Sequence, residues 1–284
     1  MSESFFLEKC CLIGESVVGN PTHFMVEQAF EDAGIDWRFL TFEVSQTRLV
    51  DALRGIAALK FSGAILLPSL QKLSWEHLPA HTERAKTTRS VSCLVEREGR
   101  LLGDDLSGES VAAAILRTHP IAGRHAVLLG IGGRGESTAL ALLQHGVQSL
   151  RIADFAGDAP GEFLDRLRGI APAAMIETLD VENDQLDLPE ETDLIVASSS
   201  WSKPKDVTVA GLVASSLSPK MVVADARVRS GYSPLLHDAV EAGAHAVTGV
   251  QILVEEVAES ISQWTGREVS RAVLHDAAEE FLGV

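Results

Sequence analysis

The stretch VLLGIGGRGESTALALLQHGVQSLRIADF, residues 127–155, decides the fold of this chain. It opens with an apolar run typical of a buried strand, turns through Gly130, Gly132 and Gly135, and continues in a helical pattern. In a G-x-G-x-x-G turn, the first glycine permits the tight turn and the second lets backbone N–H groups approach a pyrophosphate, while the third lets the helix pack on the strand. The partial positive charge at the helix N-terminus adds to the attraction for phosphate.

The next predicted strand, residues 149–154, ends in an acid. Asp154 stands 19 residues after Gly135, where a carboxylate can accept hydrogen bonds from the ribose hydroxyls of adenosine. We therefore predict a dinucleotide site, against the plainer alternative of a tight turn without a ligand. The predicted cofactor contacts are Gly130, Gly132, Gly133, Arg134, Gly135 and Asp154.

Asp154 also bears on the choice of cofactor. A carboxylate at this position repels a 2′-phosphate, and no arginine follows it in residues 155–160, so the sequence favours NAD. Arg134 is the exception, because its side chain could reach a 2′-phosphate from within the turn. NADP stays open for that reason.

Strand-like and helix-like segments alternate over the whole length, which predicts an α/β protein with parallel sheets and right-handed crossovers. We expect two lobes: an N-terminal α/β substrate lobe made of residues 1–106 with 250–284, and a Rossmann-type, doubly wound parallel-sheet dinucleotide lobe made of residues 107–249. The predicted strands cover residues 9–14, 37–44, 61–68, 125–130, 149–154, 173–179, 193–199, 221–226 and 244–249. The predicted helices include residues 21–34, 45–59, 107–119, 136–146, 249–266 and 270–284.

Local signals refine this prediction in the first lobe. Gly34 is expected to close the first helix, and Ser45 is expected to cap the second. Residues 90–105 are typical of a β-hairpin that turns at Glu98-Gly99.

Composition limits the kinds of partner. The 284 residues carry a formal net charge of −16 without a basic run, so nucleic acid is not an expected partner. No apolar run has the length of a membrane span, and the acidic start is unlike a signal peptide. The three cysteines and nine histidines show neither disulfide nor metal-ligand spacing. We expect a cytoplasmic protein with a small-molecule ligand and no metal.

The rest of the chain resembles the shikimate/quinate dehydrogenase family nearly from end to end. Residues 12–36, LIGESVVGNPTHFMVEQAFEDAGID, are similar to the family's first strand, substrate loop and first helix. Residues 127–137 match its cofactor turn, and residues 193–200, DLIVASSS, fall where the family has D-L-I-I-N-A-T. The most specific pieces are SPLL, residues 233–236, and WTG, residues 264–266. The resemblance implies a two-lobed dehydrogenase that uses NAD or NADP.

The family places a lysine and an aspartate beside the reacting carbon, where they supply and remove the proton that accompanies hydride transfer. Its G-x-N-V-T-x-P-x-K motif falls on residues 62–72, SGAILLPSLQK, and makes Lys72 the candidate lysine. A strict count from Gly63 puts Gln71 at that position instead. Lys72 is alternatively a solvated loop residue.

The family's segment ending G-x-N-T-D-x-x-G falls on residues 96–110, EREGRLLGDDLSGES, and makes Asp105 the candidate acid. A count from Gly103 places Asp105 at the family's asparagine and Ser107 at its aspartate. The pair Asp104-Asp105 could equally form a turn or the cap of the helix that follows.

The resemblance also assigns substrate contacts. The family's two serines in the first loop fall on Asn20 and Thr22, and its glutamine near the end falls on Glu256. Thr22 could instead cap the first helix, and Glu256 could be a solvated acid on a helix face. Arg227 and Arg229 are new relative to the family, and either could bind a substrate carboxylate.

The resemblance implies hydride transfer between a nicotinamide and a ring ketone or hydroxyl. The expected substrate is 3-dehydroshikimate or shikimate, in aromatic amino acid biosynthesis, or a related cyclic hydroxy acid such as quinate. The family also allows a homodimer. The alternative is a nucleotide-binding homologue that has lost this activity and acts as a sensor or partner subunit, because the substrate half departs from the family pattern.

Overall fold

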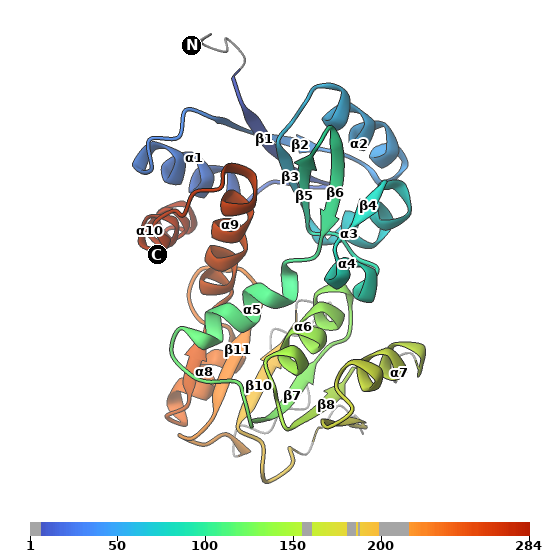
Figure 1. Cartoon of the computed structure of the whole chain (residues 1–284). Coiled ribbons are helices and arrows are strands. Elements are labelled where there is room, and N and C mark those ends of the chain that lie inside the picture. Colours follow the sequence, from blue (N-terminus) through green and yellow to red (C-terminus); the bar gives the residue numbers. More distant parts are fainter. Residues whose placement is uncertain (1–6, 155–160, 181–185, 187, 199–215) are drawn as a thin grey trace. The chain divides into compact units, whose positions relative to one another are not determined.

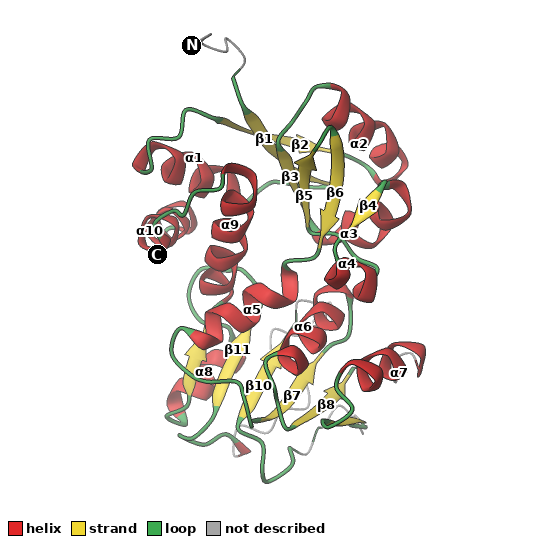
Figure 2. Cartoon of the chain, viewed as in Figure 1, coloured by secondary structure: helices red, strands yellow, loops and turns green. Residues whose placement is uncertain are grey.

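The computed structural model describes residues 7–154, 161–180, 186, 188–198 and 216–284. The chain divides into two compact units, each described by itself: Met1–Leu106 with Val254–Val284, and Ser107–Leu253. Residues 250–253 therefore belong to the second unit. Figures 1 and 2 show the elements of both units.

The first unit is built on a mixed sheet with the strand order β2-β1-β3-β5-β6-β4. Strands β1, β2 and β3 pair in parallel, whereas β5 runs antiparallel to both β3 and β6. The apolar run at the start of the chain forms β1 because both of its faces are covered, so that its Cys11 and Ile13 lie in the core. The strands are β1 (Lys9–Gly14), β2 (Arg38–Glu43), β3 (Gly63–Leu66), β4 (Ala80–His81), β5 (Cys93–Arg97) and β6 (Arg100–Asp104).

Helices cover this sheet. One of these helices is bonded to the sheet through Trp264, whose indole N–H donates to the carbonyl of Leu94 at 2.9 Å. The helices are α1 (Thr22–Asp32), α2 (Leu49–Ala58), α3 (Pro68–Ser74), α4 (Glu83–Thr88), α9 (Gly249–Thr265) and α10 (Arg271–Leu282), with short 3₁₀ turns η1 (Gln46–Arg48) and η2 (Trp75–His77). Of α9, the residues from Val254 onward belong to this unit.

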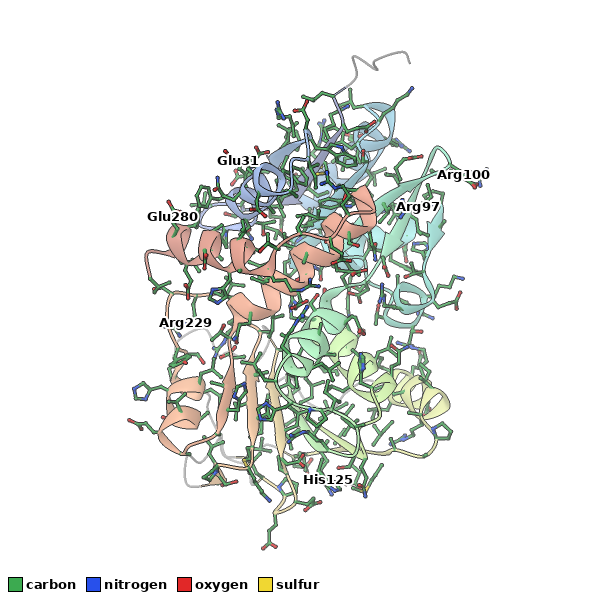
Figure 3. All side chains as sticks on the ribbon, turned by 60° about the vertical axis from the view of Figure 1, so that its left-hand side comes forward. Glu31, Arg97, Arg100, His125, Arg229 and Glu280 are labelled. Carbon is green, nitrogen blue, oxygen red and sulfur yellow. The ribbon has the colours of Figure 1, made fainter. Side chains whose placement is uncertain are left out.

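The predicted hairpin of the first unit is confirmed. Strands β5 and β6 pair from Cys93–Asp104 to Arg97–Arg100, and the two labelled arginines flank the turn in Figure 3. Glu98 and Gly99 both have positive φ, 53° and 82°, as a two-residue type I′ turn requires. Gly34 likewise has a φ of 59° directly after α1, so it ends that helix as predicted.

Two local predictions differ from the structure. Ser45 does not cap a helix, because the segment starts as the 3₁₀ turn η1 and the Ser45 hydroxyl bonds the Thr47 hydroxyl at 3.0 Å. The residues after β3, for which a loop was the alternative interpretation of Lys72, form the helix α3. Pro68 is its first residue, where the fixed φ of proline favours a helix and its missing N–H costs nothing.

The second unit has a fully parallel sheet with the order β12-β11-β10-β7-β8-β9. Chain order reverses between β7 and β10, as in doubly wound folds that bind a ligand at this point. The strands are β7 (His125–Leu129), β8 (Ser149–Ala153), β9 (Met175–Thr178), β10 (Leu194–Ala197), β11 (Val222–Asp225) and β12 (His245–Val247), and the helices are α5 (Ser107–Leu116), α6 (Gly133–Gln144), α7 (Gly161–Ile170) and α8 (Pro234–Glu241).

Alternate side chains of β7 supply two separate cores. Ala126 and Leu128 pack with α5, α6 and α7 in one core. Val127 and Leu129 belong to the other, which includes the apolar side of α8. A strand that is buried on both faces explains the continuous apolar run before the glycine turn. The predicted α/β class and parallel dinucleotide-type sheet are confirmed.

In the described part of the chain, no helix is both long enough and apolar enough to cross a membrane.

Gly108 is predicted to be essential for the packing of α5 on α6. A Cβ at Gly108 would lie 2.0 Å from the carbonyl oxygen of Ser137, and the Gly108 N–H donates to the Ser137 hydroxyl at 2.8 Å. Gly108→Ala should lower the free energy of unfolding by about 1–3 kcal/mol, because backbone must move to admit the methyl group. Urea unfolding followed by circular dichroism measures the change.

Gly55→Ala is the matched control. Gly55 lies inside α2 with open space around it, so alanine should raise the free energy of unfolding by about 0.5–1 kcal/mol through helix propensity. Equal effects of the two substitutions would contradict the packing role of Gly108.

Candidate active site

The glycine turn of the second unit follows the C-terminus of β7. Gly130 has a φ of 90°, Gly132 is the residue before α6, and Gly133 is the first residue of that helix. A Cβ on Gly135 would lie 2.1 Å from the carbonyl oxygen of Gly130. Helix and turn are therefore in direct backbone contact, which only glycine at this position allows.

Asp154 follows β8 and lies against the same turn. Its Oδ2 accepts the N–H of Ile131 at 2.6 Å. Arg134 points from α6 toward the start of α5, where its Nη1 donates to the carbonyl of Ser107 at 3.2 Å. The structure thus brings the six predicted cofactor residues together around one turn.

Sequence reasoning missed Ser198 as part of this turn. It follows β10, is buried, and its hydroxyl donates to the carbonyl of Gly130 at 3.0 Å. Its position at the end of β10 could have identified it, because β10 is the neighbour of β7 at the point where strand order reverses. The segment DLIVASSS continues beyond Ser198 into residues 199–200, which lie outside the described part of the chain.

In the first unit, strand directions gather three of the predicted residues at one edge of the sheet. Strands β1, β3 and β6 all run the same way, since β6 is antiparallel to β5, which is antiparallel to β3. Asn20 follows β1, Lys72 follows β3, and Asp105 follows β6 directly. Their segments therefore start from the same edge of the sheet.

The N-cap of the first helix is Pro21, and the side chain that accepts a backbone N–H at this end of the helix is that of Asn20, not that of Thr22. The Asn20 Oδ1 accepts the Thr22 N–H at 2.9 Å, and Thr22 is a buried residue in the first turn of α1. The interpretation of Thr22 as the cap is wrong, because α1 already begins at Thr22. The neighbouring His23 is exposed and its Nδ1 lies 2.9 Å from the Thr41 hydroxyl.

Lys72 and Gln71 lie in opposite environments on α3. Lys72 is exposed on a helix, so its interpretation as a loop lysine is wrong. Gln71 is buried, and its Nε2 donates to the carbonyl of Leu66 at 2.9 Å. Gln71 therefore anchors α3 to the end of β3, and of these two residues only Lys72 presents a titratable group.

Asp104 and Asp105 are both buried but have different partners. Asp104 is held by Arg84, whose Nε and Nη2 donate to its two oxygens at 3.0 and 2.6 Å, and by the Thr82 hydroxyl at 2.5 Å. Gln263 of α9 adds a bond at 3.0 Å. Asp105 accepts the hydroxyl of Thr88 at 2.7 Å, and both side chains are about 1% exposed.

These bonds set the charge of Asp104. Burial alone would raise its pKa, but the hydrogen bonds and charge of Arg84, with the bonds from Thr82 and Gln263, hold the pKa below its ordinary value. Asp104 is a fixed anion that joins β6 to α4 and α9.

Glu256 is buried on α9 with 4% of its surface exposed, so its interpretation as a solvated acid is wrong. One turn later the Ser260 hydroxyl donates to the Glu256 carbonyl at 2.7 Å. Burial raises the pKa of the Cys93 thiol, and the charges of Asp104 and Glu256 add to the rise. Cys93 pairs with Asp104 in the sheet, so its thiol lies near the edge at which Asp105 follows β6.

Arg227 forms an ion pair with Asp225, a residue two positions earlier in the chain. Its Nε and Nη2 donate to the Asp225 carboxylate at 2.9 and 2.6 Å, and this bidentate pair raises the pKa of the guanidinium. The pairing explains the residue without a substrate carboxylate. Arg229 is exposed and lies on the surface of the second unit (Figure 3).

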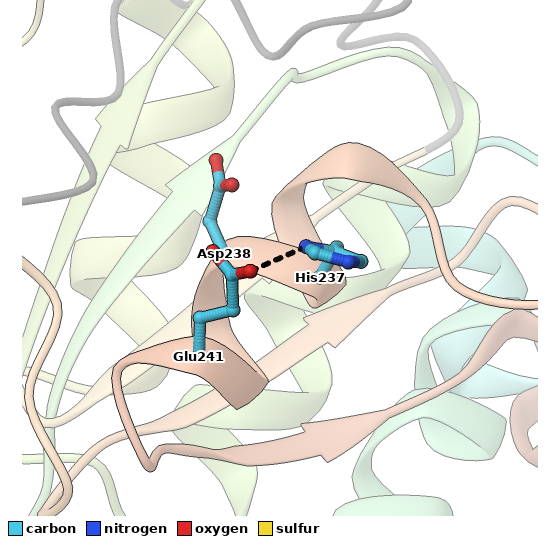
Figure 4. Close-up of side chains that lie close together, drawn as sticks. All are labelled: His237, Asp238 and Glu241. Carbon is cyan, nitrogen blue, oxygen red and sulfur yellow. Dashed lines mark ion pairs between the residues drawn. The ribbon is translucent and has the colours of Figure 1, made fainter.

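Two groups of side chains have the composition of metal ligands. His237, Asp238 and Glu241 lie on α8, and the His237 Nδ1 is 3.6 Å from the Glu241 carboxylate (Figure 4). Residues 275, 276 and 279 repeat the pattern on α10. Each group lies within a single helix and is largely solvent-facing, as surface i,i+4 ion pairs commonly are.

Loss of Arg84 is predicted to destabilise the first unit in a pH-dependent way. Arg84→Gln should lower the free energy of unfolding by about 2–3 kcal/mol at neutral pH, since Asp104 is left buried without its cation. The folded-state pKa of Asp104 is lowered, so its contribution is present above the unfolded pKa and is lost as pH falls through the folded pKa.

The loss of unfolding free energy caused by Arg84→Gln should therefore be smaller when unfolding is repeated at about pH 3. Lys86→Gln, which removes an exposed cation from the same helix, serves as control and should change stability by less than about 0.5 kcal/mol. A deficit of Arg84→Gln that is the same at both pH values would contradict the assigned charge pair.

Comparison with known proteins found similar sequences and similar folds. No family model matches the chain. A shikimate dehydrogenase (NADP(+)) of Bacillus cereus is 26% identical over 280 residues, which cover 94% of this chain and 98% of that protein. The fold is similar to that of the 5-ketofructose reductase of Gluconobacter sp. strain CHM43, with a TM-score of 0.90, 24% identity and coverage of 98% and 99%.

A quinate dehydrogenase from Corynebacterium glutamicum, in complex with NAD, has a TM-score of 0.85 at 20% identity, with coverage of 98% of this chain and 99% of that one. Similarity of both sequence and fold thus runs over nearly the whole length of the chain. In sequence the chain is similar to shikimate dehydrogenases, and in fold it is similar to a quinate dehydrogenase and a 5-ketofructose reductase.

Proposed function

We propose that the protein is an NAD(P)-dependent oxidoreductase that moves a hydride between the nicotinamide and a carbon bearing a hydroxyl or keto group. The observation that carries the proposal is the glycine turn at the end of β7, with the Asp154 carboxylate 2.6 Å from the Ile131 N–H. Dehydrogenases are the chain's relatives in sequence, and the fold is shared with a quinate dehydrogenase and a ketose reductase.

The second unit is proposed to hold the cofactor. Backbone N–H groups at the start of α6 would face the pyrophosphate, and Asp154 would accept the ribose hydroxyls. Asp154 favours NAD, because its carboxylate would repel a 2′-phosphate. Arg134 does not offset this preference, since its Nη1 donates to the carbonyl of Ser107.

Asp105 is proposed as the acid of the proton-transfer pair. Gly108 supports this choice: its Cβ position is filled by the backbone of Ser137, so it suits the last glycine of D-x-x-G, and counting back three residues reaches Asp105. A count from Gly103 starts at a glycine whose Cβ would meet only side chains. We therefore align the last glycine of the family's motif with Gly108, which places its aspartate at Asp105.

Lys72 is proposed as the second member of the pair. In reduction, the hydride brings two electrons and one hydrogen to the keto carbon, and the oxygen takes one proton from the Lys72 and Asp105 pair. Oxidation of the alcohol reverses both transfers. The bound nicotinamide supplies or accepts the hydride, while the first unit holds the substrate through Asn20, Thr22 and Glu256.

The family substrate, 3-dehydroshikimate, would place the chain in aromatic amino acid biosynthesis, and quinate is its nearest variant. A second candidate function is dinucleotide binding without turnover, in a sensor or partner subunit. The observation that favours it is the buried Gln71, tied to Leu66 at the position that a strict count gives to the catalytic lysine. Tight dinucleotide binding without oxidation or reduction of any hydroxylated ring would identify that case.

Asp154→Asn tests the cofactor assignment. Loss of the carboxylate should weaken NAD binding by about 10–100-fold, since a hydrogen bond to a charged group contributes about 1.5–3 kcal/mol. The affinity for NADP should fall less or rise, because the repulsion of the 2′-phosphate is removed. Calorimetric titration of both cofactors measures the shift.

Asp165→Asn is the control, an exposed acid on α7 of the same unit, and should leave both affinities unchanged. Parallel losses for NAD and NADP in Asp154→Asn would argue against a discriminating role for this carboxylate.

Asp105→Asn tests the proton-transfer assignment. The substitution keeps the size of the side chain and removes its basicity, so kcat should fall by about 100–10,000-fold while cofactor binding stays intact. Lys72→Ala should have an effect of the same order, and Lys86→Ala, an exposed lysine of α4, should have none. Steady-state kinetics measures kcat, and cofactor titration measures the affinity for the dinucleotide.

If Lys72→Ala turned over substrate at the rate of the unmodified protein, the lysine role would be wrong. If Asp105→Asn did so, the acid would be misassigned.

A further inference from the structure

The chain on both sides of Asp105 is fixed by hydrogen bonds. The Asp105 N–H donates to the Asp104 Oδ1 at 2.9 Å, and the Ser92 N–H donates to the carbonyl of Asp104 at 2.9 Å. After Asp105, the Leu106 N–H donates to the Ser92 hydroxyl at 2.8 Å. Because the peptide groups before and after Asp105 are held, the conformational freedom left to this residue is the rotation of its side chain.

The Thr88 hydroxyl contacts that side chain. It donates to the Asp105 Oδ2 at 2.7 Å, a length typical of a hydroxyl bound to a carboxylate, and both residues are about 1% exposed. The carbonyl of Arg84, one helical turn earlier in α4, lies 3.2 Å from the same hydroxyl. A hydroxyl has one proton to donate, and the shorter contact goes to the carboxylate, so we assign the proton to the bond with Asp105.

Helix α4 contacts two consecutive acids with two different groups. Arg84 and Thr88 are four residues apart and therefore lie on one face of the helix. Arg84 binds Asp104 through two N–H donors, so that against the effect of burial the pKa of this carboxyl stays below its ordinary value. Thr88 contacts Asp105 through a neutral hydroxyl, which can donate to a carboxylate and accept from a carboxylic acid. The Thr88 contact therefore accommodates an acid that gains and loses a proton.

We infer that Thr88 is a positioning residue for proton transfer: it fixes the rotamer of Asp105 and favours the ionised form that accepts the proton of a substrate hydroxyl. The inference rests on the proposed function, in which Asp105 belongs to the proton-transfer pair. When the alcohol is oxidised, its carbon gives a hydride to NAD(P)⁺ and its hydroxyl proton goes to that pair, while Thr88 keeps its own proton. Thr88 thus acts through Asp105 and not on the substrate.

The test uses two substitutions at Thr88 and one at its neighbour. Thr88→Val keeps the shape of the side chain and removes the hydroxyl, whereas Thr88→Ser keeps the hydroxyl. Thr87→Val is the matched control, because Thr87 is half-buried and its hydroxyl donates to the Glu83 carbonyl at 3.0 Å, one turn earlier in the same helix. Oxidation of shikimate and of quinate with NAD, and reduction of 5-ketofructose with NADH, are measured for each full-length protein.

Thr88→Val should lower kcat for the substrate that is turned over by about 10–100-fold, the effect expected when one hydrogen bond to a charged group is lost. The KM and the affinity for NAD should stay within about twofold, and Thr88→Ser should return kcat to within about threefold of the unmodified protein. Thr87→Val should leave all three values unchanged. An unchanged kcat in Thr88→Val, or a loss that Thr88→Ser does not reverse, would overturn the inference while leaving the proposed function in place.

Carbon-13 NMR of the aspartate carboxyl groups gives a readout that needs no turnover, with the Asp105 signal assigned by its loss in Asp105→Asn. In Thr88→Val the titration midpoint of this signal should move up by about one pH unit or more, since the ionised form loses a donor. Thr88→Ser and Thr87→Val should keep the midpoint of the unmodified protein. The charged residues of neighbouring elements are the same in every variant: Arg84 on α4, Asp104 on β6, Lys72 on α3 and Glu256 on α9.

If NAD binds but none of the three substrates is turned over, the proposed function fails and the NMR titration alone decides the inference. A higher midpoint in Thr88→Val then supports the positioning of Asp105 by Thr88, and an unchanged midpoint overturns it. Should circular dichroism show that Thr88→Val does not fold, Thr88→Ala takes its place with the same expected results.

Discussion

Parallel strand pairing is the constraint on which both candidate sites depend. Because β7, β8 and β10 run in the same direction, the residues that follow them start from one edge of their sheet, and a glycine turn, an acid and a serine meet there. The same direction shared by β1, β3 and β6 collects Asn20, Lys72 and Asp105 in the other unit. In the second unit, α6 connects β7 to β8 and α8 connects β11 to β12, and such crossovers return the chain to the starting edge, so that residues far apart in sequence become neighbours.

Buried charge pairs hold the loops at these edges. Arg84 fixes Asp104 at the end of β6, and Arg227 fixes Asp225 at the end of β11. Such pairs bring little net stability once the cost of desolvation is counted, but loss of one partner is expensive. They are therefore best understood as fixing loop geometry.

Much of this architecture could be predicted from the sequence, because strong local signals agreed with the global fold. The Glu98-Gly99 turn, the apolar run before Gly130 and the end of α1 at Gly34 each have one physical solution. The roles of the other residues depend on their partners in the folded protein. Nothing local distinguishes Asp104 from Asp105, and only the fold shows that Arg84 engages the first and Thr88 the second. The burial of Glu256 likewise depends on neighbours distant in sequence, whereas the start of α3 at Pro68 and the bond from the Thr22 N–H to Asn20 are local features.

The most direct test of the central claim is the transfer of isotope from the cofactor. The protein would be given the reduced nicotinamide dinucleotide with deuterium at both C4 positions, together with a panel of hydroxylated ketones, and the products examined by mass spectrometry. Our account predicts that deuterium appears on the carbon that becomes the alcohol, with NAD as the better carrier. A protein that binds the dinucleotide and leaves all the deuterium on the nicotinamide would contradict it.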